Sequence, residues 1–188
     1  MASKKEEKRA ALMQAALELF AEQGFSGSPT ALIAKRAGVA SGTLFFHFTS
    51  KEDLIRELFE QVRGKVEKTI SEDTRDQVSL RERFLQTFAR LLRYFLDNPD
   101  EFKFLELYHF SPFNEERCCN SGEAAPLKDL LLQARQQGLI KDAPLLFLEA
   151  IAFGPIASLA KEHANRRTPI DDELVRLTVE ACWEGLKS

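Results

Sequence analysis

The stretch AGVASGTLFFHFTSKEDL, residues 37–54, decides how the N-terminal part of this chain folds. A short apolar segment leads into Gly38, where the chain can turn, and a second short helix begins two or three residues later. This second helix places Leu44 and Phe48, four positions apart, on the same side. Two short helices joined by a turn over about 29–48 are typical of a helix-turn-helix.

The second short helix carries three phenylalanines and a histidine in a row, Phe45, Phe46, His47 and Phe48. Successive helical positions lie about 100° apart, so these four side chains cannot all point inward. Phe48 shares the core side with Leu44, and Phe45 and His47 are left to face outward. The pattern assigns no side to Phe46.

Apolar residues recur at spacings of three and four along nearly the whole chain, which predicts an all-α fold. The first helix is expected to end at Gly24, and Ser28 and Pro29 to serve as N-cap and first residue of the next helix. Ser50, with Asp53 three positions on, is expected to cap a fourth helix that runs towards residue 70. The later helices are predicted at about 80–97, 99–110, 125–137, 144–164 and 171–187, with connectors at 71–77 and 111–122.

The last two predicted helices, about 144–164 and 171–187, are apolar on two sides each, and a helix of this kind has to be covered on two sides. One side can face the chain's own core while the other meets a second copy, which predicts a homodimer with a four-helix interface. The alternative is that both helices are central within one subunit. Close approach of a partner helix would be allowed by four small residues, Gly154, Ala157, Ala181 and Gly185.

The charge of the 188-residue chain is unevenly distributed. The formal net charge is −3, yet residues 1–51 contain seven lysines and arginines against four glutamates, which leaves the remainder at −6. An acidic average argues against a protein that coats nucleic acid indiscriminately. A basic N-terminal piece suits a protein that touches phosphate with one end.

Several classes of function find no support in the sequence. It has no nucleophile-elbow, phosphate-loop or zinc-protease motif, and His47, His109 and His163 lie far apart, so neither an enzyme nor a metal site is expected. Nothing suggests a cofactor. The charged start lacks a signal-peptide core, and 150–160, the longest late uncharged stretch, is too short to span a bilayer. With an odd number of cysteines, we expect a cytoplasmic protein without a disulfide framework.

The stretches AALELFAEQGF, 15–25, and IAKRAGVASGTLFFHFTSKEDLI, 33–55, resemble the DNA-binding domain of the TetR (tetracycline repressor) family of transcriptional regulators. The resemblance implies a nine-helix, two-domain TetR-like fold. It would have an N-terminal three-helix DNA-binding domain over residues 1–51 and a C-terminal helical effector-binding and dimerisation domain over 52–188. It further implies a repressor that a small molecule releases from a palindromic double-stranded DNA operator.

The resemblance also implies roles for individual residues. Ser41, Gly42 and Thr43 would read or approach bases, and Phe45 would pack against the DNA backbone or a thymine methyl group. His47 and Lys51 would contact phosphate, although a histidine beside phenylalanines can also be structural. The secondary candidates are Ser28, Thr30 and Lys35, and the lysines at 4, 5 and 8 either add sequence-independent contacts or form a solvated helix end.

The middle of the chain is rich in aromatic residues, which suits a pocket for a hydrophobic or aromatic effector, although core packing explains most of them equally well. The chosen candidates for ligand contact are Phe88, Tyr108, His109 and Phe147.

Two alternative functions remain open at this level. Cys118 and Cys119, in a polar segment beside Arg117, could form a redox sensor, and a helical adaptor could keep the fold without binding DNA. Salt-dependent binding to the upstream region of its own gene would separate a regulator from an adaptor.

Overall fold

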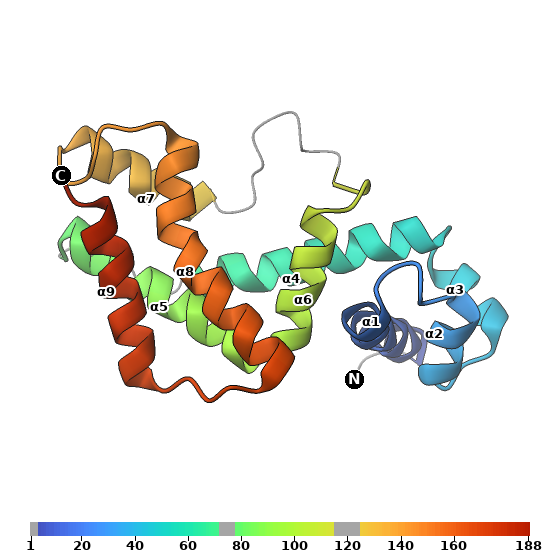
Figure 1. The fold of residues 1–188 in the computed structure, drawn as a ribbon. Helices are drawn as coiled ribbons and strands as arrows, with labels where there is room; N and C mark the ends of the chain where they lie inside the picture. Colours follow the sequence, from blue (N-terminus) through green and yellow to red (C-terminus); the bar gives the residue numbers. More distant parts are fainter. Residues whose placement is uncertain (1–3, 72–77, 115–124) are drawn as a thin grey trace. The chain divides into compact units, whose positions relative to one another are not determined.

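The computed structural model describes residues 4–71, 78–114 and 125–188, and this part of the chain forms nine α-helices, as predicted. Figure 1 shows their order along the chain. Their bounds are α1 Lys4–Gln23, α2 Thr30–Arg36, α3 Ser41–His47, α4 Lys51–Ser71, α5 Leu80–Asp97, α6 Pro99–His109, α7 Ala125–Gln136, α8 Leu145–Arg166 and α9 Asp172–Leu186. In the described ranges, no helix is both long enough and apolar enough to cross a bilayer.

The first of two compact units comprises the chain up to Arg63 together with the stretch that begins at Asp100. Its core collects aromatic side chains from distant parts of the sequence. Phe20 of α1 stacks on Phe104 of α6 with ring centroids 6.2 Å apart, and Phe59 of α4 stacks on Tyr108 at 3.9 Å. The helix-turn-helix therefore rests on a core to which α4 and α6 also contribute.

Two glycines set the turns that bound the short helices. Gly24 follows α1 with φ 71°, and Gly38 lies between α2 and α3 with φ 68°. A left-handed backbone of this kind is unfavourable for residues with a Cβ, so glycine ends each helix without strain. The Gly38 amide donates to the Lys35 carbonyl at 3.1 Å, and the Val39 amide donates to the Ala34 carbonyl at 3.0 Å.

The prediction for the start of α2 was wrong in its capping residue. Pro29 is the N-cap and Thr30 begins the helix. Ser28 is fully buried, and its hydroxyl donates to the carbonyls of Leu19 at 3.0 Å and Gly24 at 2.8 Å. A tertiary contact with the end of α1 thus takes the hydroxyl that local capping would have used. The predicted cap at Ser50 is confirmed, since its Oγ accepts from the Asp53 amide at 3.0 Å.

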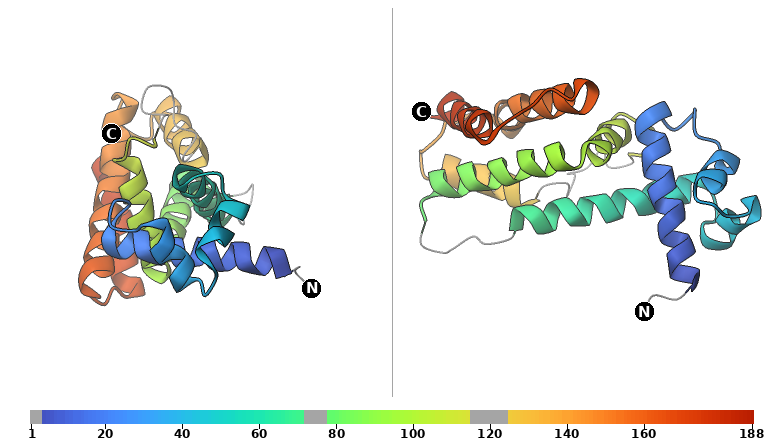
Figure 2. Two further views of the ribbon diagram at one scale, coloured as in Figure 1. Left: turned by 90° about the vertical axis from the view of Figure 1, so that its right-hand side faces the viewer. Right: turned by 90° about the horizontal axis from the view of Figure 1, so that it is seen from below.

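The second compact unit comprises Gly64–Pro99 and the C-terminal helices. Within it, α8 and α9 run side by side and both pack on α5, while α7 packs on α5 and α8 (Figures 1 and 2). The core is aromatic at its centre, where Phe84 stacks on Phe88 with ring centroids 4.1 Å apart and Trp183 lies 5.2 Å from Phe84. These four helices thus share one apolar interior.

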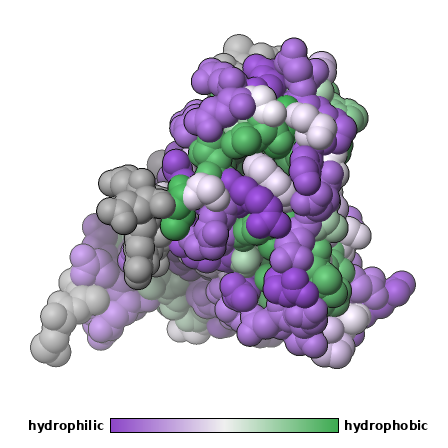
Figure 3. All heavy atoms as spheres, turned by 90° about the vertical axis from the view of Figure 1, so that its left-hand side faces the viewer, coloured by the Kyte–Doolittle hydropathy of each residue, from purple (hydrophilic) through white to green (hydrophobic). Residues whose placement is uncertain are grey.

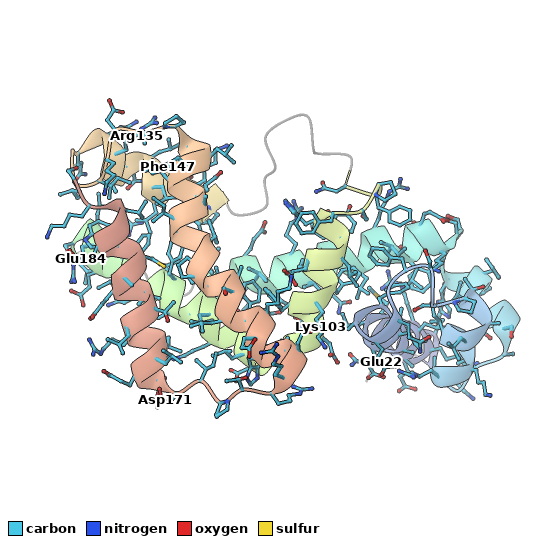
Figure 4. All side chains as sticks on the ribbon, in the orientation of Figure 1. Glu22, Lys103, Arg135, Phe147, Asp171 and Glu184 are labelled. Carbon is cyan, nitrogen blue, oxygen red and sulfur yellow. The ribbon has the colours of Figure 1, made fainter. Side chains whose placement is uncertain are left out.

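Helices α8 and α9 each have a buried side and an exposed apolar side. The buried side of α8 carries Leu148, Ala152, Ile156, Ala160 and Ala164. Large apolar side chains are exposed at Leu146 and Phe147 on α8 and at Leu174 and Leu177 on α9. Figure 4 labels Phe147 near the start of α8 and Asp171 at the N-cap of α9, and Figure 3 shows hydrophobic patches among polar residues on one face.

Candidate nucleic-acid interface

Helix α3 has one anchored side and one exposed side. Leu44 and Phe48 are at most 1% exposed and belong to the core of the first unit, as predicted. Phe45 is 59% exposed and Phe46 71% exposed. Two large apolar side chains in water on a seven-residue helix leave apolar surface available to a partner. The outward position expected for Phe45 is therefore confirmed, and Phe46 joins it.

The start of α1 and the exposed side of α3 together line a groove of about 590 Å³. Lys5 places its Nζ 5.2 Å from the centroid of the Phe46 ring, a cation–π contact that joins the two helices. The full lining consists of Lys4, Lys5, Lys8, Ala40, Gly42, Thr43, Phe46 and His47. The groove combines three positive side chains with small, polar and aromatic groups.

Phe46 is the residue of this groove that sequence reasoning left without a role. Helical spacing placed it on neither the core side nor the outer side of α3. Its environment depends on Lys5, which lies 41 positions earlier and reaches it through the packing of α1 on α3. The uninterrupted run of aromatic residues was the available signal, because one short helix cannot bury four consecutive rings.

His47 lies in this groove with an unusual proton affinity. Partial burial lowers the pKa of its imidazole, and the positive charges of Lys5, Arg9 and Lys8 lower this pKa further. The imidazole is therefore neutral at pH 7, and one ring nitrogen carries a proton that can be donated. A neutral histidine can still donate a hydrogen bond to a phosphate oxygen.

Lys51 points into the protein. Its ammonium donates a short hydrogen bond to the carbonyl of Phe25 and lies 5.9 Å from the centroid of the Phe20 ring. Burial lowers the pKa of this lysine, because a charged amine loses solvation there. The side chain expected to reach phosphate thus fastens the start of α4 to the segment after α1.

The remaining candidates for DNA contact divide by burial. Ser41, Gly42 and Lys35 are exposed at the helix-turn-helix, and Thr43 and Thr30 are partly buried. Ser28 is enclosed, as described above. Beside Lys35, the Arg36 guanidinium is engaged by the Glu22 carboxylate at 2.8 Å.

The four predicted ligand contacts lie in different environments. Phe88 belongs to the aromatic interior of the second unit and Tyr108 to the core of the first, where its hydroxyl donates to the Phe113 carbonyl at 3.1 Å. His109 is exposed at the end of α6, and Phe147 is exposed on α8. The pair Cys118 and Cys119 lies outside the described residues. The part of the chain that the structure describes contains no group of three or more potential metal ligands.

The sequence matches two models of one family over nearly its whole length. Residues 12–58 match "Bacterial regulatory proteins, tetR family", and residues 50–188 match "Tetracyclin repressor-like, C-terminal domain". The fatty acid metabolism regulator protein of Bacillus subtilis is 35% identical over 79 residues, which are 42% of this chain and 41% of that protein.

Solved structures extend the likeness to the whole chain. A TetR family transcription regulator from Marinobacter aquaeolei superposes with a TM-score of 0.85 and 28% identity, covering 100% of this chain and 99% of that one. The regulator FadR of Bacillus subtilis, solved in complex with stearoyl-CoA, shares the fold with a TM-score of 0.67 and 22% identity over 92% of this chain and 95% of its own. From the helix-turn-helix and both matched regions together, we conclude that this chain belongs to the TetR family of bacterial transcriptional regulators.

Proposed function

We propose that this chain is a ligand-responsive repressor that binds a palindromic operator as a homodimer and is released by a small hydrophobic effector. The observation that carries the proposal is the groove in which the lysines of α1 flank the exposed side of α3. Positive side chains neutralise phosphates and release counterions, and an exposed helix of a helix-turn-helix fits the major groove of DNA.

Different residues of the groove contact different parts of the DNA. Lys4, Lys5 and Lys8 lie along the start of α1 and hold the phosphate backbone. Gly42 and Thr43, on the first turn of α3, approach base edges, since small side chains allow close contact. Phe45 and Phe46 offer apolar contact to sugars and thymine methyl groups. His47 donates to phosphate from its neutral form.

The dimer forms through the exposed sides of α8 and α9. Leu146, Phe147, Leu174 and Leu177 supply apolar area, and Gly154 on the exposed side of α8 allows a partner helix to approach closely. Two recognition helices related by a two-fold axis then read two half-sites of a palindrome. This assignment supports a cytoplasmic regulator that acts on double-stranded DNA and has no enzymatic role.

The effector acts on the second domain, for which we propose residues 52–188. The relatives support an apolar effector, because one of them is named as a regulator of fatty acid metabolism. Within that domain, Phe88 is the candidate contact in the apolar interior, and Phe147 is a candidate only if it is not covered by the proposed dimer. Tyr108 and His109 lie on α6, which belongs to the first compact unit. The second candidate function is redox sensing through Cys118 and Cys119. If this function is correct, treatment with peroxide changes the affinity of the protein for its operator.

The test is a selection of bound fragments from the source genome with the full-length protein, followed by titration of the selected operator at several salt concentrations. A repressor of this kind binds a palindrome with an affinity that falls steeply with salt. Thr43→Ala should change the base preference of the selected site, and Lys35→Ala should leave the preference unchanged. Binding that is weak on every fragment and insensitive to salt would favour the helical adaptor instead.

A further inference from the structure

A polar stripe runs along α5 in the second unit, on a helix whose other residues build an aromatic core. Arg83, Thr87 and Arg90 are spaced at four and then three positions, so they lie on one side of the helix. Thr87 is buried, and both arginines are partly buried. Phe84 and Phe88, beside this stripe, are fully buried.

The two guanidinium groups of the stripe are incompletely satisfied. The Nε atoms of Arg83 and Arg90 are both buried and have no hydrogen-bond acceptor among the described residues. Arg90 does donate through Nη2, to the Ile70 carbonyl at 3.2 Å and the Thr87 hydroxyl at 3.4 Å. In the described part of the chain, no carboxylate is paired with either arginine.

Buried donors without acceptors are rare in native proteins, and each of these Nε–H groups is such a donor although its arginine is partly exposed. Two of them, two helical turns apart on one side, would be explained by a ligand that brings acceptors and negative charge. A guanidinium recognises carboxylate and phosphate oxygens in the same forked geometry. The stripe therefore has the chemistry of an anion site that borders an apolar interior.

We propose that Arg83 and Arg90 bind the anionic head group, a carboxylate or a phosphate, of a small amphiphilic ligand in the second unit. This inference rests on the proposed function, in which that ligand is the effector, and it replaces a merely hydrophobic effector with one that has a charged end. The alternative is that the arginines are structural, with Arg90 serving only to cap the last carbonyls of α4.

The chain carries its own reporter for the test. Trp183 is the single tryptophan of the sequence, and its ring lies 5.2 Å from that of Phe84, the residue that follows Arg83. Tryptophan fluorescence of the full-length protein can therefore be followed during titration with three probes of equal chain length: decanoate, decanoyl-CoA and uncharged 1-decanol. The first two separate carboxylate from phosphate recognition.

We expect at least one anionic probe to bind about tenfold more tightly than 1-decanol. Arg83→Gln should remove that advantage, and Arg81→Gln, at an exposed position of the same helix, should keep it. Arg83→Met should raise the melting temperature of the ligand-free protein by about 2–4 °C, because it removes a buried donor that has no acceptor, while lowering the ligand-induced shift. A purely structural arginine predicts the reverse change in melting temperature.

Equal affinity for all three probes would overturn the inference, and this comparison needs no variant, so misfolding of a variant does not weaken it. Equal behaviour of Arg83→Gln and Arg81→Gln would also overturn it. Operator release is measured separately. If an anionic probe binds through Arg83 but leaves the operator complex intact, the anion site stands and its proposed role as effector site fails. If operator binding itself is absent, the repressor proposal fails while the fluorescence result remains valid.

Discussion

Large apolar side chains are exposed in both compact units, but the charges around them differ. On α3, Phe46 lies under the ammonium of Lys5 in a groove with two further lysines. On α9, Leu174 and Leu177 flank Arg176, whose guanidinium is held by Glu173 at 2.7 Å and Glu180 at 2.8 Å. Exposure alone does not identify a partner. Basic charge beside an aromatic ring suits a polyanion, whereas apolar area bordered by neutralised charge suits another protein surface.

A charge placed on the proposed dimer surface of α9 should have the largest effect. Leu177→Glu should weaken the proposed homodimer at least about 100-fold, because an unpaired buried carboxylate costs about 3–5 kcal/mol. Sedimentation equilibrium measures the effect. Phe110→Glu, at an exposed phenylalanine just after α6 in the first unit, is the control variant and should leave the proposed dimer intact. Equal dissociation of both variants would contradict the assigned interface.

Removing charge from the groove tests whether its lysines contact phosphate. Lys5→Ala with Lys8→Ala should weaken binding to all duplexes alike and reduce the salt slope by about two units, since each phosphate contact releases about one counterion. Fluorescence anisotropy at four salt concentrations measures the slope. A double variant with Lys187→Ala and Lys161→Ala, which loses the same charge in the second unit, should leave the slope unchanged. A loss confined to one operator sequence would argue against phosphate contact.

Lys51 is a cation of the first unit whose ammonium faces the protein instead of solvent. Lys51→Ala should lower the free energy of unfolding by about 1–2 kcal/mol, since the Phe25 carbonyl loses its donor. Chemical denaturation measures this loss. Lys35→Ala, at an exposed lysine, should have no effect on stability. If Lys51→Ala instead leaves stability intact and flattens the salt slope, Lys51 does contact phosphate.

The smallest expected effect is the pH dependence contributed by His47. The pKa of its imidazole is lower in the folded protein than the usual 6.5, so the unfolded chain binds the proton more readily. The neutral form therefore contributes stability that is present above pH 6.5 and is lost as the pH falls through the folded pKa. Melting curves at pH 7.5 and 5.5 should show a smaller loss for His47→Gln than for the wild type. An equal loss in both proteins would show that the titration of His47 does not contribute to the pH dependence of stability.

The sequence predicted most of the helices because their signals are local. Gly24 and Gly38 lie at helix ends because of their left-handed backbone conformation. Leu44 and Phe48 are spaced by four positions, which places both on the same buried side. The Ser28 hydroxyl was assigned to a local cap, yet it bonds the carbonyls of Leu19 and Gly24. Propensity could not reveal this, because the competing acceptors belong to α1 and to the turn that follows it.

Side chains whose roles depend on distant partners were harder to place. Tyr108 suited an aromatic ligand by composition, but it stacks on Phe59, which lies 49 positions earlier. Lys51 fitted a phosphate contact by its position after the recognition helix, but its direction depends on the Phe25 carbonyl. The sequence shows where aromatic and basic residues occur. Which of them are exposed to solvent depends on how α1, α4 and α6 pack together.

The turn at Gly38 has a practical consequence for the unfolded chain. Its φ of 68° is unfavourable for an L-residue and is the ordinary conformation of a D-amino acid. D-alanine introduced by chemical ligation would therefore match the backbone of the native turn while restricting the freedom that glycine retains when the protein unfolds. The link between α2 and α3 is thus a site where a D-residue would stiffen the unfolded chain without altering any side chain that is proposed to contact DNA.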